Sequence, residues 1–474
     1  MQTLRSERME SNNEHSLAVR LLAFLICLSI VPLGVASRGN AESLRALLLI
    51  SVDGMRPDYV TQASAHGLKI PHLLQMLTEG SYASGVRGAL PTVTYPSHTT
   101  ILTGVWPARH GIFLNTTFDP LNKNLDGWYW YTQDIHVPTL WEAASHAGMT
   151  VASVSWPVSV GAHDVRYLIP EFWRAGTPDD LKLLRTVSTP GLLSELQEKL
   201  GPYITDLNNA VAGDRQRTRY AAEILRAKQP EFMTVHLAAL DHLEHQTGPF
   251  SPESNETLEQ IDQMIGELED ALRSRHPDAA ICVVSDHGFT RTDHHLHLMV
   301  PFAQEGFIKI DPKTVDWPEP RVLEWSAVPW VDGGSAAIVL KDPANQTVKD
   351  KVAQLLSRLT ANTTNGIAQI LDQKGIAARG GAPTAAFWVD MKSNYVVDKS
   401  FHQPLVTETK IGGSHGYSPD NPDLEASFFI MGPNIRKGVN LGKIDMRSIA
   451  PTLAHYLNVS LPSADLAPLE LETP

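Results

Sequence analysis

The feature of this sequence that most constrains its fold is the alternation of short apolar runs with stretches of helical periodicity. The runs are apolar along their whole length, as strands buried on both faces of a parallel sheet are. They are RALLLISVD near Leu47, MTVASVSW near Val151, FMTVHLAAL near Val235, AAICVVSDHG near Val283 and ASFFIMG near Phe428. Such strands, separated by helices, predict a layered α/β fold around a mostly parallel sheet.

Helical periodicity fills most of the intervening sequence. Apolar residues recur at helical spacing in IPHLLQMLTEG, from Thr139 to Gly148, in the stretch that starts at Arg217, and from Glu256 to Arg275. The alternation breaks between residues 298 and 409, where tryptophans and prolines precede a separate strand-like run, GGSAAIVLKDP. We expect residues 298–409 to form an inserted cap subdomain, and residues 37–297 and 410–474 to form the core around the main sheet.

The N-terminal segment predicts export. An apolar run from Leu21 to Ser37 ends in small residues around Ala36, as a secretory signal peptide does, so residues 1–36 are predicted to be removed and the protein to be periplasmic or secreted. A segment retained as an anchor is the alternative, and only then would the protein contact a membrane. The chain has two cysteines, of which Cys27 lies inside this run, so a disulfide within one mature chain is excluded.

The charge balance narrows the choice of partners. A formal net charge of −13 argues against binding of nucleic-acid polymers, which requires basic surface to neutralise phosphates. If the chain handles a small anionic substrate, something other than lysine must supply the positive charge.

Carboxylates and histidines recur near the carboxyl ends of the predicted strands, where open α/β sheets form their ligand crevice. They are Asp53 after LLLISV, Asp241 and His245 in DHLEH, Asp286 and His287 in SDHG, and His415 in GGSHGYSPDNP. Carboxylate and imidazole ligands without thiolates are those of two Zn²⁺ ions in a hydrolytic site, and manganese or iron would fit the same ligand types. Two such ions would hold a phosphoryl group and supply the missing positive charge.

The run PTVTYPSHTTILTG contributes a hydroxyl. Proline is favoured in the first turn of a helix, so we expect Pro96 to open a helix that continues through Leu102. Thr94 then lies at the positive end of that helix, which attracts phosphates. Taken alone, Thr94 is better explained as a helix cap or a solvated strand residue than as a nucleophile.

With these residues in place, the chain resembles the nucleotide pyrophosphatase/phosphodiesterase branch of the alkaline phosphatase superfamily. The similarity runs from LLLISVDGMRPDYV to SIAPTLAHYLNVSLP and is strongest in PTVTYPSHTTILTGVWPARHGI, which is similar to the family's nucleophile motif. The resemblance implies an alkaline phosphatase-like three-layer sandwich. It also implies a two-zinc hydrolase that acts on phosphodiester or pyrophosphate bonds of small molecules, such as nucleotides or phospholipid head groups.

The resemblance also implies roles for single residues. Thr94 would attack phosphorus and form a covalent phosphothreonine, while Asn115 would donate a hydrogen bond to a non-bridging phosphoryl oxygen. One zinc would be held by Asp241, His245 and His415, and the other by Asp53, Asp286, His287 and the Thr94 oxygen. Glu244 stands where the family commonly has glycine, and we expect it to narrow or acidify the rim of the site.

Other functions fit these residues less well. A phosphomonoesterase or phosphonate-cleaving hydrolase of the same superfamily would share the metals, but Asn115, and the lack of an arginine in the nucleophile run before Arg109, favour the diester. A sulfatase requires cysteine or serine where this chain has Thr94. A binding protein that keeps the metals only for structure would not need the nucleophile.

Two further groups stand out and have structural explanations. His294, His295 and His297 lie in the run DHHLHL, beyond the matched ligands, and we do not expect them to bind metal. Trp325, Trp330 and Trp388 lie in the expected cap, where packing is favoured over stacking on a ligand.

Overall fold

The computed structural model describes residues 45–124, 127–173, 178–203, 210–314, 320–401 and 403–472. The expected signal peptide, residues 1–36, and Cys27 within it lie outside these ranges. Over the described part of the chain, no helix is long and apolar enough to cross a membrane.

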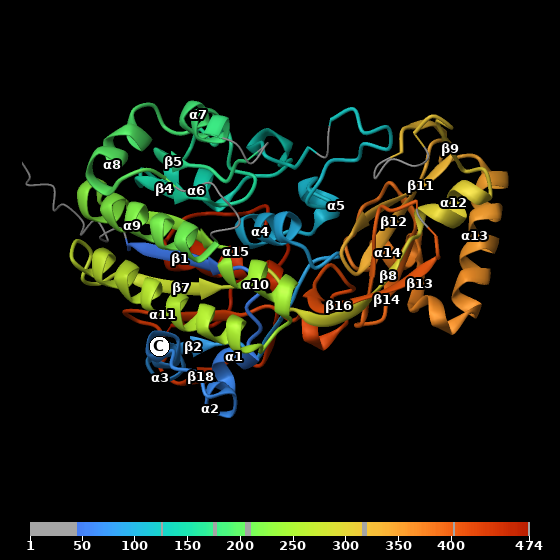
Figure 1. Ribbon diagram of the computed structural model, residues 1–474. Coiled ribbons are helices and arrows are strands. Elements are labelled where there is room, and N and C mark those ends of the chain that lie inside the picture. Colours follow the sequence, from blue (N-terminus) through green and yellow to red (C-terminus); the bar gives the residue numbers. More distant parts are fainter. Residues whose placement is uncertain are drawn as a thin grey trace, which may run out of the picture. The chain divides into compact units, whose positions relative to one another are not determined.

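An eight-stranded sheet lies at the centre of the fold, with the strand order β18-β2-β17-β7-β1-β6-β4-β5 (Figure 1). Its strands are β1 (Leu47–Val52), β2 (Gly80–Tyr82), β4 (Val151–Val154), β5 (Tyr167–Ile169), β6 (Phe232–Leu237), β7 (Ala280–Val284), β17 (Phe428–Met431) and β18 (Val439–Asn440). β1 is parallel to both neighbours, with Leu47 opposite Phe232 of β6 and Ala280 of β7. β4 pairs parallel with β6, and β5 pairs parallel with β4, so the expected mostly parallel sheet is confirmed.

One of the five predicted strands runs in the opposite direction. β17 pairs antiparallel with β7, with Phe428 opposite Val284 and Met431 opposite Ile281. The expectation of a parallel strand here was wrong, because a run buried on both faces is apolar throughout whichever way the strand points.

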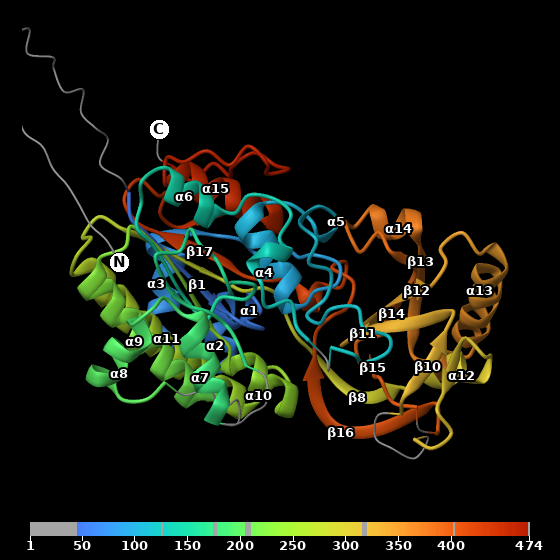
Figure 2. The same cartoon turned by 90° about the horizontal axis from the view of Figure 1, so that it is seen from above.

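Helices cover both faces of the sheet, because side chains of a strand point alternately to its two sides. One face carries α3 (Pro71–Glu79), α9 (Ala210–Lys228) and α11 (Pro252–Arg273), and the other carries α4 (Thr94–Thr103), α6 (Leu140–His146) and α15 (Ile449–Tyr456). In β1, Leu48 and Ile50 are buried in the first core, whereas Leu47 and Leu49 are buried in the second. Figure 2 shows the two groups of helices on opposite sides of β1, which is the expected three-layer sandwich.

The four predicted helices are present, and two of them start earlier than expected. α9 starts at Ala210 rather than near Arg217. α11 starts at Pro252 rather than at Glu256, because the Ser251 hydroxyl accepts a hydrogen bond from the Ser254 N–H at 3.1 Å and caps the helix.

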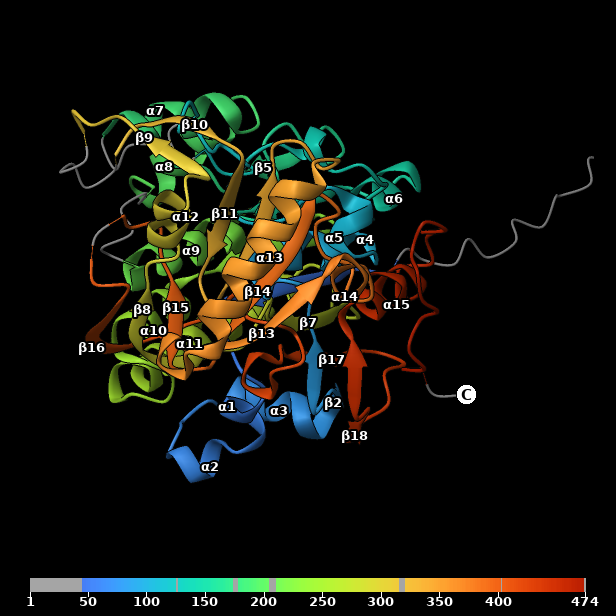
Figure 3. The same ribbon diagram turned by 90° about the vertical axis from the view of Figure 1, so that its right-hand side faces the viewer.

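A separate antiparallel sheet lies within residues 298–409, with the strand order β11-β12-β14-β13. Its strands are β11 (Ala327–Asp332), β12 (Ser335–Leu340), β13 (Ile367–Asp372) and β14 (Ala385–Met391), and α13 (Gln346–Ala361) packs on it (Figure 3). In a small sheet, β8 (Thr290–Leu296) of the expected core pairs with β15 (Tyr395–Val397) of the expected cap and with β16 (Val406–Ser414), which runs across the expected limit at 409/410. The limits of the cap subdomain therefore stay a prediction.

The remaining elements are mostly short. The helices are α1 (Asp58–Thr61), α2 (Ala63–His66), α5 (Pro107–His110), α7 (Pro178–Val187), α8 (Leu192–Leu200), α10 (Ala239–Thr247), α12 (Met299–Gln304) and α14 (Gln373–Ala377). The strands are β3 (Gly85–Arg87), β9 (Ile308–Ile310), β10 (Val322–Trp325) and β19 (Lys443–Asp445). β9 pairs with β10, and β3 with β19.

Candidate active site

The six residues predicted as metal ligands lie together in two groups of three. The inner cluster consists of Asp53, Asp286 and His287, and the outer cluster consists of Asp241, His245 and His415. Within each cluster, one ligand atom per residue lies within 4.8 Å of the others. Their role as ligands stays a prediction, but the convergence on which it depends is present.

The inner cluster forms where two neighbouring parallel strands end. Asp53 directly follows β1, and Asp286 and His287 lie just beyond the end of β7. The Nε2 atom of His287 lies 3.3 Å from Asp53 Oδ1 and 3.1 Å from Asp286 Oδ2. All three side chains are buried, with at most 5% of any one exposed.

The outer cluster combines a helix with a strand from the small sheet. Asp241 was expected to close a strand, but β6 ends at Leu237, and Asp241 and His245 lie one turn apart on α10. The Nε2 atoms of His245 and His415 each lie 3.5 Å from Asp241 Oδ1. This cluster is more open, since 43% of the His245 side chain is exposed.

The two clusters are adjacent. The rings of His287 and His415 stack with their centroids 3.8 Å apart and their planes 12° apart. One histidine of each cluster therefore packs against a histidine of the other.

The hydrogen bonds of the three histidines leave the same ring nitrogen facing each cluster. The Nδ1 atom of His287 lies 3.1 Å from the Gly288 carbonyl oxygen. The Nδ1 atom of His245 lies 3.1 Å from the Gly413 carbonyl oxygen, and that of His415 lies 3.2 Å from the Thr92 carbonyl oxygen. A carbonyl only accepts, so each Nδ1 carries a hydrogen and Nε2 is the nitrogen that faces the carboxylates. This is how histidines that ligate a metal are usually held.

The carboxylates also fit metal ions. Asp53 Oδ1, Asp286 Oδ2 and Asp241 Oδ1 are buried and, as long as the histidine Nε2 atoms beside them carry no hydrogen, have no hydrogen-bond donor among the described residues. A buried carboxylate oxygen without a donor is costly. A cation in each cluster would satisfy all three oxygens.

The close approach of several carboxylates also indicates that the inner cluster suits a cation. Burial, together with the neighbouring carboxylates of Asp286 and Asp241, raises the pKa of Asp53 well above its usual range. Burial opposes a charge on His287, but the Asp286 carboxylate outweighs it and raises the pKa of His287 to about 10. In the absence of a metal, a proton on His287 therefore occupies the place that a metal ion would take.

The nucleophile candidate lies against the inner cluster. Thr94 Oγ1 is 3.5 Å from His287 Nε2 and is almost fully buried. α4 starts at Thr94 itself, two residues earlier than Pro96 predicted, because Val93 is still extended and proline is tolerated anywhere in the first turn. The Thr94 hydroxyl thus lies at the positive end of α4, as expected.

Asn115 lies beside the start of the same helix. Its side-chain Oδ1 accepts a hydrogen bond from the Tyr95 backbone N–H at 2.9 Å, and its backbone N–H donates to Asp332 Oδ2 at 3.0 Å. Because the side-chain oxygen accepts from the first turn of α4, the side-chain nitrogen Nδ2 is the group of Asn115 that can donate to a ligand.

Buried polar residues behind the inner cluster were missed by the sequence reasoning. His236 Nε2 lies 2.9 Å from Asp53 Oδ2, and its Nδ1 lies 2.7 Å from Glu171 Oε2. Burial opposes a charge on His236, but the Glu171 and Asp53 carboxylates raise its pKa well above the usual range. A histidine inside the apolar run FMTVHL was the available signal, whereas Glu171 follows β5, which has only three residues and left no recognisable pattern.

Glu244 does not lie at the rim, and the expectation that it would was wrong. It is fully buried, and its Oε1 accepts a hydrogen bond from the Tyr59 hydroxyl at 2.7 Å. Its Oε2 lies so close to the backbone of Gly54 that a Cβ added at that glycine would be only 2.8 Å away. α10 places this side chain against the main body of the fold, so it cannot acidify the opening.

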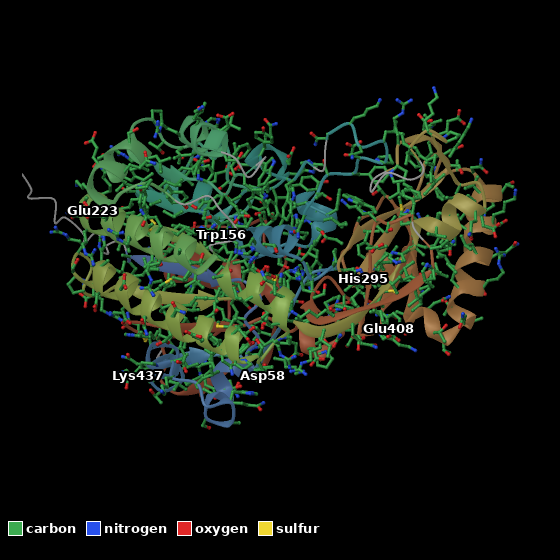
Figure 4. The ribbon with its side chains drawn as sticks, viewed as in Figure 1. Asp58, Trp156, Glu223, His295, Glu408 and Lys437 are labelled. Carbon is green, nitrogen blue, oxygen red and sulfur yellow. The ribbon has the colours of Figure 1, made fainter. Side chains whose placement is uncertain are left out.

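The additional histidines are engaged with other groups. His297 Nδ1 lies 2.7 Å from Asp398 Oδ1, and His294 hydrogen-bonds Asp293. In Figure 4, His295 lies by the strands of the small sheet. Among the described residues, only the inner and outer clusters bring three potential ligands together.

The tryptophans of the expected cap mostly serve packing. Trp330 and Trp388 are buried in one apolar cluster, and Trp325 packs against its edge. Trp156, outside the expected cap, packs against His98 with ring centroids 4.9 Å apart.

Comparison with known proteins places this chain in a family. The family model described as type I phosphodiesterase / nucleotide pyrophosphatase matches residues 47–418. Ectonucleotide pyrophosphatase/phosphodiesterase family member 3 of Mus musculus is 27% identical over 293 residues, which cover 59% of this chain and 28% of that protein. An uncharacterized pyrophosphatase/phosphodiesterase of Schizosaccharomyces pombe is 25% identical over 465 residues, which cover 93% of this chain and 82% of that protein.

A solved structure has the same fold. Murine ectonucleotide pyrophosphatase/phosphodiesterase 5, in an inactive form in complex with AMP, aligns with a TM-score of 0.61 at 19% identity, over 88% of this chain and 96% of that one. The expected alkaline phosphatase-like sandwich is thereby confirmed. The chain spans about a quarter of the mouse family member 3, whereas it spans most of the fission-yeast protein. With more than half of its length matched by the family model, this chain belongs to the type I phosphodiesterase / nucleotide pyrophosphatase family.

Proposed function

We propose that this chain is a two-metal hydrolase that cleaves phosphodiester or pyrophosphate bonds of small molecules through a covalent phosphothreonine at Thr94. The observation that carries the proposal is the position of Thr94 Oγ1, at the start of α4 and 3.5 Å from the inner-cluster atom His287 Nε2. The adjacent outer cluster places a second potential cation site beside the first.

The reaction proceeds in two displacements. The Thr94 hydroxyl loses its proton to solvent, and Oγ1 attacks phosphorus. The Oγ1–P bond forms and the bond from phosphorus to the leaving oxygen breaks, with its electron pair passing to that oxygen, which then takes up a proton. Two divalent cations, when bound, lower the pKa of the hydroxyl and neutralise the developing charge. The amide nitrogen of Asn115 and the N-terminus of α4 donate to the non-bridging oxygens. Water then cleaves the Oγ1–P bond and restores the Thr94 hydroxyl.

Zn²⁺ is the proposed metal, with three protein ligands in each cluster. Imidazole and carboxylate ligands suit zinc, and sites with three protein ligands keep a position open for substrate. Manganese or iron are accepted by the same ligand types.

The proposed substrates are small phosphodiesters, with nucleotide derivatives first and phospholipid head groups second. The family name and the AMP held by the related mouse protein support the nucleotide. The net charge of −13 argues against a nucleic-acid polymer. Export to a periplasm or to the outside is proposed from the apolar run between Leu21 and Ser37.

The proposal is tested by parallel hydrolysis assays on the zinc-loaded chain. The substrates are p-nitrophenyl thymidine monophosphate, bis-p-nitrophenyl phosphate and p-nitrophenyl phosphate. We expect diester turnover well above monoester turnover and highest for the thymidine compound. Dominant monoester turnover would instead indicate a phosphatase.

The nucleophile is tested with two threonine variants on the same helix. Thr94→Ala is expected to abolish turnover, and acid quenching of the wild type should trap phosphate on Thr94, as detected by mass spectrometry. Thr103→Ala is the matched control, since Thr103 is also buried on α4, and in the described hydrogen bonds its hydroxyl donates only to the Thr99 carbonyl, at 2.7 Å. Turnover that survives in Thr94→Ala would exclude the covalent mechanism.

A further inference from the structure

The two oxygens of Asp53 face different partners. Oδ1 lies 3.3 Å from His287 Nε2 and faces the inner cluster. Oδ2 lies 2.9 Å from His236 Nε2, behind that cluster. The rotation of the Asp53 carboxylate about its last bond is therefore set by His236, and this rotation decides where Oδ1 points.

The ring of His236 is itself held from its other side. Its Nδ1 lies 2.7 Å from Glu171 Oε2 and 3.1 Å from the Ser155 carbonyl oxygen. His236 is 1% exposed and Glu171 is 6% exposed, so water does not compete for these bonds. Carboxylate and carbonyl oxygens only accept, and the imidazole consequently donates from both nitrogens.

The same network reaches the start of α4. The second oxygen of Glu171, Oε1, accepts a hydrogen bond from the Tyr95 hydroxyl at 2.9 Å. Tyr95 directly follows Thr94, and its backbone N–H donates to Asn115. A continuous set of buried hydrogen bonds thus joins Asp53 to the residue next to the candidate nucleophile.

We propose that His236 and Glu171 are positioning residues, which hold Asp53 in the orientation that binds an inner-cluster metal and, through Tyr95, hold the first turn of α4 beside it. This inference rests on the two-metal site proposed above. Neither residue contacts the ion or the substrate directly. Their contribution is the fixed geometry of one ligand and of the nucleophile relative to each other.

An effect of His236 and Glu171 on the geometry of Asp53 can be distinguished from an effect of their charges, because the two residues carry opposite charges. His236→Gln removes a positive charge near the inner cluster, and Glu171→Gln removes a negative one. If the pair acted through its electric field, the two variants would shift metal affinity in opposite directions. If it acts by holding Asp53, both variants weaken binding.

The test measures zinc affinity of the full chain by competition with a chromophoric chelator. Both variants are made in a His245→Ala background, which lacks an outer-cluster ligand, so that the remaining ion reports on the inner cluster. We expect each variant to bind zinc about 10- to 100-fold more weakly, the usual loss when the partner of a metal ligand is removed. Cobalt substitution should show a changed d–d absorption spectrum, which reports directly on ligand geometry. Glu171→Asp, which keeps a carboxylate, should recover part of the affinity.

A matched control is His110→Gln. His110 is also fully buried and hydrogen-bonded, with Nε2 3.2 Å from Thr100 Oγ1, but it does not contact any cluster residue in the described contacts. Its zinc affinity should stay within about threefold of the parent. Circular dichroism of each metal-free variant verifies the fold.

The link to α4 is tested separately with Tyr95→Phe, which removes only the hydroxyl. In the wild-type background, we expect zinc affinity within about threefold and kcat lowered by up to about tenfold with KM unchanged, as for loss of one buried hydrogen bond. An unchanged kcat would remove this link from the proposal.

The outcomes distinguish this inference from the proposed function. A wild-type chain that binds two zinc ions, with unaltered or oppositely shifted affinities in the two glutamine variants, overturns the positioning role alone. A wild-type chain that binds no zinc overturns the proposed function together with the inference.

Discussion

The inner and outer clusters contain the same ligand types in very different surroundings. Asp286 and His287 of the inner cluster are fully buried, whereas 43% of the His245 side chain in the outer cluster is exposed. The inner carboxylates are also held from behind, by His236 and by the Gly54 N–H, which donates to Asp286 Oδ1 at 3.2 Å. The outer histidines are held by backbone carbonyls, of Gly413 for His245 and of Thr92 for His415.

From this difference we expect the two clusters to have separate tasks. Charges that are buried and fixed in advance stabilise a transition state without reorganisation, which suits the cluster that contacts Thr94. An open cluster lets a leaving group depart and water enter. We therefore expect the inner ion to be essential and slowly exchanging, and the outer ion to be the more easily removed.

The largest effect is expected from loss of an inner ligand. Asp286→Asn should lower the metal content to one ion per chain and lower turnover about a thousandfold, because several kcal/mol of charge stabilisation disappear. Metal analysis and steady-state kinetics measure both. Asp262→Asn is the control, since Asp262 is equally buried but, among the described residues, accepts hydrogen bonds only from the backbone of His72 and Leu73. Retention of two ions in Asp286→Asn would contradict the assignment.

A smaller effect is expected from the outer cluster. In wild type, a chelator should withdraw one ion quickly and the other slowly, and His245→Ala should lack the fast phase while turnover falls about 100-fold. The control is His242→Ala, on the same helix, where the histidine contacts only Gln246 in the described hydrogen bonds. Release of both ions in a single phase would contradict the expected difference in ion exchange between the two clusters.

The pH dependence of stability sharpens the comparison. In the metal-free chain, burial opposes the charge on His287 but Asp286 raises its pKa to about 10, against an ordinary value of 6.5. Between these values the folded chain keeps a proton that the unfolded chain has lost, so this contribution is complete below roughly pH 6.5 and disappears as the pH rises through about 10. The melting temperature of the metal-free chain should fall over this interval more than that of the zinc-loaded chain, where an ion replaces the proton.

The control for this titration is metal-free His287→Gln, which cannot bind the proton. Its melting temperature should change less between neutral pH and pH 10 than that of the metal-free wild type. Equal slopes in the two metal-free proteins would show that another group is responsible.

The smallest effect is expected from Glu244. Glu244→Ala leaves the Tyr59 hydroxyl without its acceptor and should lower the free energy of unfolding by about 1–3 kcal/mol without changing metal content. Glu244→Gln keeps an acceptor oxygen and should cost less. Denaturant unfolding distinguishes the two, and loss of a metal ion in either variant would show that Glu244 contributes to the outer cluster.

The sequence predicted the layers of the fold because fully apolar runs and helical periodicity are local patterns. Strand direction is not a local pattern, and β17 was accordingly placed in the sheet with the wrong orientation. Helix starts moved for a similar reason: the Ser251 cap and the extended Val93 decide where α11 and α4 begin, not the proline or the apolar periodicity alone.

The approach of Asp53, Asp286 and His287 could be predicted because side chains near the ends of neighbouring parallel strands lie close together. Asp241 and His245 were expected at a strand end but lie on α10, and His415 follows β16 of the small sheet. The supporting residues could not be predicted. Glu171 follows a strand too short to recognise, and Asp332 reaches Asn115 from the separate antiparallel sheet, a contact between residues more than 200 positions apart. Glu244 was misplaced because a helical position adjacent to a ligand reveals nothing about which side of the helix is buried.

The central claim is most directly tested by anomalous diffraction at the zinc edge from crystals of the zinc-soaked chain. The account predicts two peaks, one among Asp53, Asp286, His287 and Thr94 Oγ1, and one among Asp241, His245 and His415. Absence of a peak from the inner cluster, or zinc bound instead by the histidines of β8, would contradict it.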